Sequence, residues 1–68
     1  MIEVGDTVMW TNTESTYAKW FYSHIGVVES INKGHCRVRW CIPVKYHDRY
    51  TSSSDFSLDN FTTFRANS

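Results

Sequence analysis

Aromatic side chains outside the expected core are the strongest candidates for recognition chemistry in this sequence. An open group of them offers a large contact area at low entropic cost and can bind a peptide, a cation or a stacked base. Tyrosine and tryptophan also serve as half-buried structural plugs, which is the competing interpretation. The candidates are Tyr17, Trp20, Tyr22, Tyr46 and Tyr50.

A pair of arginines is the second candidate feature. Arg37 and Arg39 project from the same face of a predicted strand because side chains alternate along it, and Lys33 and His35 lie nearby. Such a basic patch can bind acidic groups of a partner or a few phosphates. The competing interpretation is an ordinary solvated face, whose arginines pair across the strands with carboxylates such as Glu29.

The residue types that bind zinc are present, but their spacing argues against a metal site. Neither a Cys-x-x-Cys nor a His-x-x-x-His pair occurs, and an unbroken strand would place Cys36 and Cys41 on opposite faces. We therefore expect no metal, no cofactor and no disulfide, with Cys36 acting as a small buried hydrophobe. No nucleophile elbow, phosphate-binding glycine loop or paired-carboxylate motif occurs either, so we expect no enzymatic activity.

Length and composition predict one small folded domain. The chain has 68 residues, of which 41% are hydrophobic and 16% aromatic, as is typical of a folded protein with a thin core. We expect the domain to span residues 1–65 and residues 66–68 to form a short C-terminal tail. No apolar run approaches the roughly 18 residues of a membrane-spanning helix, and the few cysteines suit a reducing compartment. We therefore expect a cytoplasmic protein that binds no membrane.

Alternating apolar residues predict the strands that must position the candidate side chains. Val8 and Trp10 share one face of a first strand, and a long polar loop over residues 12–19 follows it. A second strand is predicted over about residues 23–31. Within it, Gly26 is typical of a bulge or of a close backbone approach.

A hairpin and a fourth strand come next in the prediction. Turn chemistry at residues 32–34 folds the third strand back antiparallel to the second. Pro43 is expected to end this third strand because it has no N–H to donate. Residues 44–50 are predicted as a short fourth strand and residues 51–55 as a loop. The inward face of the third strand is predicted to carry Cys36, Val38, Trp40 and Ile42.

The last elements complete an all-β fold. Residues 58–61 suit a single 3₁₀ turn, and residues 62–64 a closing strand. Five short strands, a long first loop and a late 3₁₀ turn predict a small, strongly bent barrel that is closed or nearly closed. Its core is expected to contain Trp10, Trp40, Phe56, Phe61 and Phe64.

The order of several segments resembles a known group of domains. The segments "VGDTVMW", "HIGVVESI", "CRVRW", "YHDRY" and "DFSL" are similar in order and spacing to those of Mib/Herc2-type domains. These belong to the SH3-like small barrels, as do Tudor and KOW domains. The resemblance covers roughly Val4 to Leu58 and implies a five-stranded SH3-like barrel in which Tyr46 and Tyr50 face the first loop. It also implies a binding module, more often for peptide or protein segments than for small molecules.

These observations predict a small non-enzymatic protein-binding module. The exposed aromatics would form its binding surface, and Arg37 and Arg39 would steer an acidic protein or peptide partner towards it. We expect a stand-alone adaptor or inhibitor of the size that compact genomes, such as those of phages, encode. One alternative is a KOW-like or Tudor-like nucleic-acid module, which the net charge of +0 disfavours. A structural or virion-associated homo-oligomer, with oligomeric state open, is the further alternative.

Overall fold

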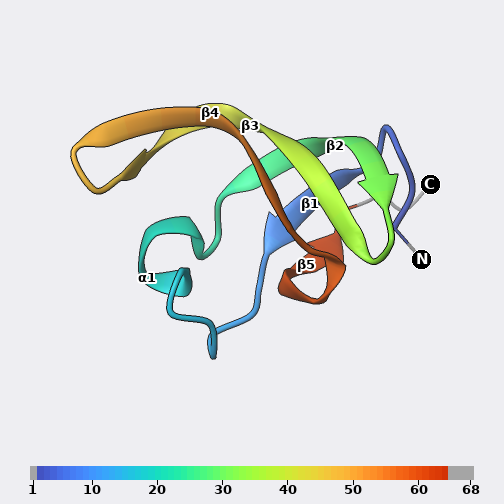
Figure 1. The fold of residues 1–68 in the computed structure, drawn as a ribbon, viewed down its shortest axis with the longest axis horizontal. Helices are drawn as coiled ribbons and strands as arrows, with labels where there is room; N and C mark the ends of the chain where they lie inside the picture. Colours follow the sequence, from blue (N-terminus) through green and yellow to red (C-terminus); the bar gives the residue numbers. More distant parts are fainter. Residues whose placement is uncertain (1, 65–68) are drawn as a thin grey trace.

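The computed structural model describes residues 2–64, which form five strands and two helical turns (Figure 1). The predicted tail at residues 66–68 lies outside the described residues. In chain order the elements are β1 (Thr7–Trp10), α1 (Ala18–Phe21), β2 (Ile25–Asn32), β3 (His35–Tyr46), β4 (Arg49–Ser57), the 3₁₀ turn η1 (Leu58–Asn60) and β5 (Phe61–Thr63). The predicted 3₁₀ turn before a short last strand is confirmed.

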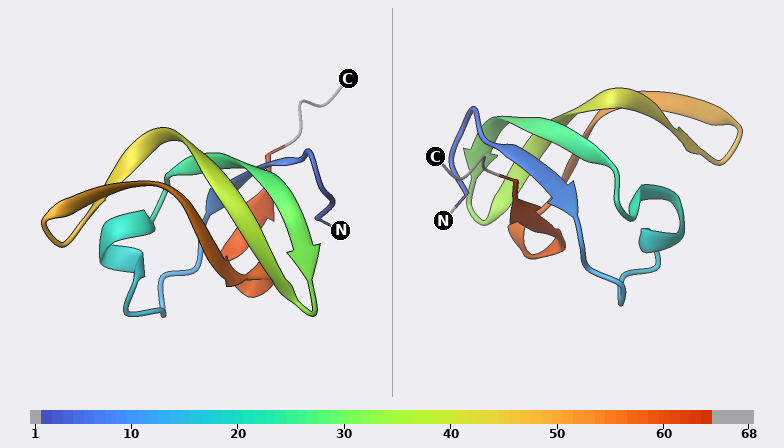
Figure 2. Two further views of the ribbon diagram at one scale, coloured as in Figure 1. Left: turned by 45° about the horizontal axis from the view of Figure 1, so that its top comes forward. Right: turned by 180° about the vertical axis from the view of Figure 1, so that it is seen from behind.

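The strands form one five-stranded antiparallel sheet in the order β4-β3-β2-β1-β5. The long β3–β4 hairpin bends over α1, as two views show (Figure 2). β4 and β5 are the edges, and the sheet does not close. The all-β prediction is confirmed, whereas the closed barrel is not.

The β2–β3 hairpin forms where the turn chemistry predicts it. Asn32 pairs with His35, so only Lys33 and Gly34 lie in the turn. Both turn residues have positive φ, 50° and 81°, which is the requirement of the tight turn that matches the twist of paired strands. Glycine adopts this conformation without steric cost. The hairpin prediction is therefore confirmed.

Pro43 does not end the third strand, because β3 continues to Tyr46. The pairing of β3 with β4 shifts between Arg39 and Val44, and the regular pairing of β3 with β2 ends at Trp40. The proline thus lies in a stretch without regular pairs, where its missing N–H removes no ladder hydrogen bond. The sequence prediction is wrong because this shift in register depends on the pairing of β3 with β4, which the local sequence does not indicate.

The boundaries predicted for the next two segments are also wrong. Residues 44–50 do not form a separate strand: they contain the end of β3, a tight turn and the start of β4. Residues 51–55, predicted as a loop, lie within β4. The serine run is held in the sheet by partners across the strands. Ser54 pairs with Val38, and its hydroxyl accepts a hydrogen bond from Trp40 Nε1 at 3.2 Å.

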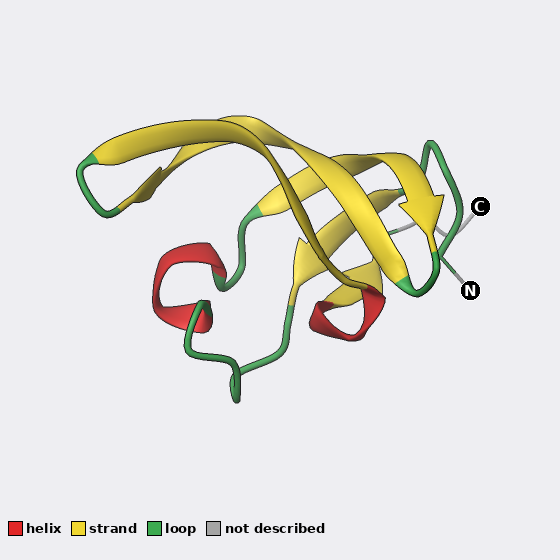
Figure 3. Cartoon of the chain, in the orientation of Figure 1, coloured by secondary structure: helices red, strands yellow, loops and turns green. Residues whose placement is uncertain are grey.

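The core lies on the face of the sheet that α1 and η1 cover (Figure 3). Ile42 is predicted to belong to it but is 73% exposed, because it lies in the irregular stretch of β3. Val44 instead takes the next buried position of that strand. The buried apolar residues are Val8, Trp10, Ala18, Phe21, Val28, Cys36, Val38, Trp40, Val44 and Phe61.

Four of the five predicted core aromatics contribute to this core. Trp10, Trp40 and Phe61 are buried, and Phe56 is half-buried against them. Phe64 is 55% exposed, so its assignment to the core is wrong. The alternation of side chains explains this result: when Phe61 faces inward, the residue three positions later faces outward.

Gly26 marks a close approach between strands. It pairs with Val8 of β1 and with Trp40 of β3, and a Cβ atom built on it would meet Val38 Cγ1 and lie 2.7 Å from the Arg39 carbonyl oxygen. The shift in the β2–β3 register lies elsewhere, between Val28 and Ser30. Of the two predicted roles of this glycine, close approach is the one observed.

Asn60 connects the first loop to η1 through side-chain hydrogen bonds. Its replacement by alanine is expected to lower the free energy of unfolding by about 2 kcal/mol. The side chain is only 9% exposed, accepts a hydrogen bond from Asn12 Nδ2 at 2.8 Å and donates one to the Ser57 carbonyl at 3.2 Å. Urea denaturation followed by tryptophan fluorescence measures the loss. Thr13→Ala, at an exposed position of the same loop, is the control; equal stability of the two variants would contradict the role of Asn60.

Within residues 2–64, no helix has the length and apolar character needed to cross a membrane. The helical elements, α1 and η1, are single turns of four and three residues.

Candidate functional site

Aromatic rings and one imidazole meet between α1 and the tip of the β3–β4 hairpin. Trp20 meets Tyr46 edge-on, with ring centroids 4.9 Å apart and ring planes at 79°, and Tyr17 lies 6.0 Å from Tyr46. His47 lies 4.9 Å from Trp20 and 4.2 Å from Tyr46. We call Tyr17, Trp20, Tyr46 and His47 the aromatic cluster. Three of the five predicted aromatic candidates are therefore brought together.

α1 is a helical turn that the polar stretch around it does not predict, and it sets the position of Trp20. Ala18 and Phe21 lie three residues apart and are both buried, so they fix the turn to the core. The Phe21 ring stacks on Trp10 at 5.5 Å and on Trp40 at 5.3 Å. Trp20 lies between the two anchors in sequence and is half-buried. The backbone of Trp20 is thus anchored to the core while part of its ring stays in solvent.

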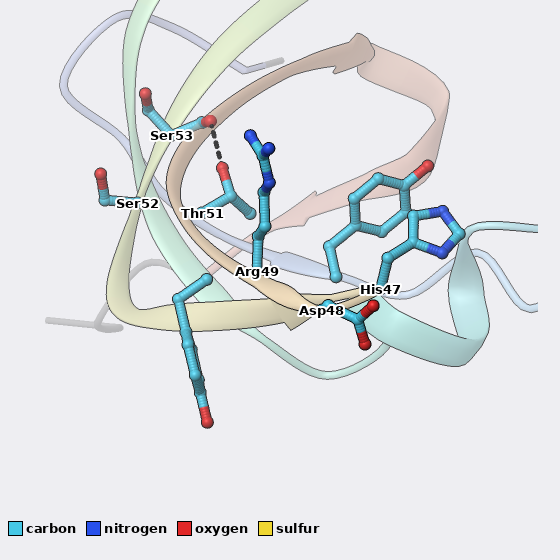
Figure 4. Close-up of a pocket in the computed structure, with 8 residues that line it drawn as sticks. His47, Asp48, Arg49, Thr51, Ser52 and Ser53 are labelled. Carbon is cyan, nitrogen blue, oxygen red and sulfur yellow. Dashed lines mark hydrogen bonds between the residues drawn. The ribbon is translucent and has the colours of Figure 1, made fainter.

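The tip of the β3–β4 hairpin supplies the other half of the cluster. His47 adopts a φ of 56°, a left-handed conformation in which histidine is enriched among non-glycine residues. Tyr46 then pairs directly with Arg49 across the turn. His47, Asp48 and Arg49 extend from this turn in different directions (Figure 4). The two elements that carry the cluster are far apart in sequence, so the rings meet only in the folded chain.

Two of the predicted tyrosines lie outside the cluster. Tyr50 is 71% exposed and pairs with Lys45, and the alternation along β3 places this pair on the opposite face of the hairpin from Tyr46. Tyr22 follows α1, is 50% exposed and borders a shallow hollow together with Thr13. Neither residue shares a ring contact with the cluster among the contacts of the described residues.

Arg37 and Arg39 are ion-paired within the chain. Glu29 lies between them, with Arg39 Nε 2.7 Å from Glu29 Oε2 and Arg37 Nε 3.8 Å from Glu29 Oε1. Arg37 Nη1 also contacts Asp55 Oδ2 at 3.2 Å. Exposed pairs of this kind contribute about 0–1 kcal/mol each to stability. We call Glu29, Arg37, Arg39 and Asp55 the charge ladder; its charges balance, as the competing interpretation of a solvated strand face expects.

The charges beside the aromatic cluster are different. Lys19 Nζ lies 4.4 Å from the centroid of the Trp20 ring, within the range of a cation–π contact. Arg49 is exposed and makes no ion pair with any residue of the described range 2–64. Partial burial raises the pKa of the Tyr46 hydroxyl, and the neighbouring Tyr17 adds to this shift. The Tyr46 hydroxyl therefore stays protonated and able to donate a hydrogen bond under physiological conditions.

Lys19, His47 and Arg49 are site residues that sequence reasoning missed. Lys19 adjoins Trp20 in the sequence, but only the helical turn places its ammonium group over the ring. His47 and Arg49 would have been found from the correct turn, since a tight turn at residues 47–48 pairs Tyr46 with Arg49. The sequence prediction of residues 44–50 as one strand contains no turn at residues 47–48, so it does not pair Tyr46 with Arg49.

A hollow of about 610 Å³ lies along the curled hairpin and is lined by residues 46–53 (Figure 4). Arg49 and Thr51 extend side by side there, and the Thr51 hydroxyl donates a hydrogen bond to the Ser53 carbonyl at 2.8 Å. The walls of this hollow come from a single hairpin and carry the hydroxyl groups of Thr51, Ser52 and Ser53.

The cysteines do not lie in the aromatic cluster. Cys36 is buried, as expected, and burial raises the pKa of its thiol, with the charge of Asp55 adding to the shift. Cys41 is exposed. Among residues 2–64, no three histidine, cysteine or acidic side chains are grouped so that they could hold a metal ion.

Comparison with protein-family models, with curated proteins and with solved structures finds no match for this chain.

Proposed function

We propose that this chain is a small non-enzymatic protein-binding module whose aromatic cluster holds a peptide segment of its partner. The observation that carries the proposal is the meeting of Tyr17, Trp20 and Tyr46 at a part of the surface where Tyr17 is still 41% exposed. Trp20 and Tyr46 are half-buried, as structural plugs also are, so the exposed ring of Tyr17 is what favours recognition over a plug. Exposed tyrosine and tryptophan are the residue types that dominate binding energy at interfaces.

The anchoring of the cluster to the core supports the proposal. Phe21 anchors α1 in the core, and Tyr46 lies 5.6 Å from the Phe21 ring. Side chains that are already fixed lose little entropy when a partner binds, so more of the contact energy appears as affinity.

We also propose that the bent sheet is that of an SH3-like barrel. The strand order and the 3₁₀ turn before β5 fit that fold.

The proposal rests on the aromatic cluster alone. The suggested steering of an acidic partner by Arg37 and Arg39 is a separate hypothesis, because Glu29 and Asp55 already balance these two charges. Replacing the arginines therefore tests the steering hypothesis and also provides a control for surface changes made away from the cluster.

Selection from a random peptide library tests the proposed function. The wild type, Trp20→Ala and Arg37→Gln/Arg39→Gln are used as targets, each checked for folding by circular dichroism. We expect peptides enriched by the wild type to bind Trp20→Ala at least about tenfold more weakly, as for a central interface residue. If steering is small, the arginine variant retains affinity within about threefold.

Other results would contradict the proposal. Equal binding by Trp20→Ala would show that the cluster does not hold the peptide. Salt-sensitive binding to an oligonucleotide in place of peptides would support the nucleic-acid alternative. A mass that rises with protein concentration, together with loss of that rise in Trp20→Ala, would support a homo-oligomer that packs through the cluster.

A further inference from the structure

We infer that the segment bound by the aromatic cluster is an acidic peptide, with a carboxylate that contacts Lys19 or Arg49 beside apolar side chains that contact the rings. This inference rests on the proposed function, because it names the chemistry of the partner at the same site. It differs from steering by Arg37 and Arg39, since it assigns direct contacts to two other cations.

Two cations, Lys19 and Arg49, lie beside the two central rings of the cluster. Lys19 is exposed with its Nζ over the Trp20 ring, and Arg49 is the cross-strand partner of Tyr46. Trp20 and Tyr46 are themselves in edge-on contact at 4.9 Å. Each ring of this central pair therefore has a cation beside it, so a segment lying on the pair comes within reach of positive charge.

Neither of these cations has an acidic partner among residues 2–64. Within residues 2–64, the ion pairs all belong to the charge ladder, and neither Lys19 nor Arg49 takes part in one. Asp48, in the turn beside Arg49, is the acidic residue closest to the cluster in sequence, and it offsets only one of the two charges. Lys19 and Arg49 therefore place two positive charges beside the central ring pair against the one negative charge of Asp48, although the whole chain has a net charge of +0.

The arrangement of the rings favours a peptide over a nucleic acid. Bases bind proteins by stacking on open aromatic faces, one ring after another. Here the Trp20 ring carries Lys19 and meets Tyr46 at 79°, so the central pair offers no parallel run of open faces. Two unpaired cations also neutralise few phosphates. Crossed rings with flanking cations suit apolar side chains and carboxylates, which pair with lysine and arginine through charge-assisted hydrogen bonds.

Three arrays of eight-residue peptides test the inference, each with varied apolar residues at fixed positions. The intervening positions are glutamate in the first array, glutamine in the second and lysine in the third. We expect the wild type to bind the best glutamate peptides at least about tenfold more tightly than their glutamine counterparts at 50 mM salt. This preference should shrink to about threefold or less at 0.5 M salt, where exposed charges are screened.

Matched variants assign the preference to the two cations. Lys19→Gln/Arg49→Gln is expected to abolish the preference for glutamate. Lys33→Gln/Lys45→Gln removes the same charge from the β2–β3 turn and from the opposite face of the hairpin, and it should retain the preference within about twofold. Equal loss in both double variants would overturn the inference, since only overall charge would then matter.

The outcomes separate the inference from the proposed function. Glutamine peptides that bind as tightly as glutamate peptides, with loss of both in Trp20→Ala, would overturn the inference and leave the proposed function intact. Absence of binding to every array, or binding that Trp20→Ala does not change, would overturn both. Tighter binding of a single-stranded oligonucleotide, lost in Trp20→Ala, would replace the acidic peptide with a nucleic acid.

Discussion

Replacing Gly26 with alanine is expected to remove more than half of the free energy of unfolding of the protein. Gly26 lies in the centre of the sheet, between Val8 of β1 and Trp40 of β3. The added Cβ would lie 2.7 Å from the Arg39 carbonyl oxygen, and backbone at that distance cannot yield without separating the strands. A cost of about 3 kcal/mol or more is expected for such overpacking. That is a large part of the roughly 5 kcal/mol that stabilises a small domain.

Urea denaturation followed by tryptophan fluorescence measures this effect, and Gly34→Asn provides the matched control. Gly34 has a φ of 81° but no atom within 4 Å of a built Cβ. Asparagine tolerates the left-handed conformation better than most residues, so the control should lose less than about 1 kcal/mol. If Gly26→Ala were as stable as the control, the close approach of β2 and β3 would be incorrect.

Trp10→Ala is expected to have an effect of similar size on stability. Trp10 is 0% exposed, and its ring lies against Phe21, Phe56 and Phe61 at centroid distances of 5.5, 4.8 and 5.4 Å. Its Nε1 donates a hydrogen bond to the Asn12 carbonyl at 2.7 Å. Truncation of such a side chain leaves a cavity and costs about 3–5 kcal/mol. Differential scanning calorimetry should therefore show a strongly lowered or absent unfolding transition.

The matched control for this change is the same substitution at Trp20. This ring is half-buried at the surface, so Trp20→Ala should lower the free energy of unfolding by only about 1 kcal/mol while weakening peptide binding at least about tenfold. Comparison of Trp10→Ala with Trp20→Ala thus distinguishes an effect on the free energy of unfolding from an effect on peptide binding. A Trp20→Ala protein that unfolds as readily as Trp10→Ala would assign Trp20 to the core and remove the basis for the proposed site.

The parts of the fold that follow from local pattern could be predicted from the sequence. The β2–β3 hairpin was predictable because glycine at the turn and alternating apolar residues in both strands act within a few residues of one another. Gly26 could be recognised because a glycine inside a β-branched stretch usually has a steric reason. The end of β3 and the serine strand β4 could not be predicted, because they depend on a register shift that arises only when the strands pair.

In the candidate site too, features that depend on residue type are predictable from the sequence, whereas features that depend on the folded chain are not. Tyr17, Trp20 and Tyr46 were predictable by residue type, and the fold brings them together. Tyr50 was grouped with them because its face depends on the position of the turn, which the sequence prediction placed wrongly. The role of Lys19 is not predictable, because nothing in the polar stretch before Trp20 indicates the helical turn that places Lys19 over the ring.

Mapping of a selected peptide by backbone-amide NMR tests the central claim most directly. The ¹⁵N-labelled protein is titrated with the tightest peptide from the library, and changes in amide chemical shift are recorded for each residue. The account predicts that the largest changes fall in α1 and at residues 45–49, with small changes at Arg37 and Arg39. Changes centred on Arg37 and Arg39, with none in α1, would contradict the claim that the aromatic cluster is the binding surface.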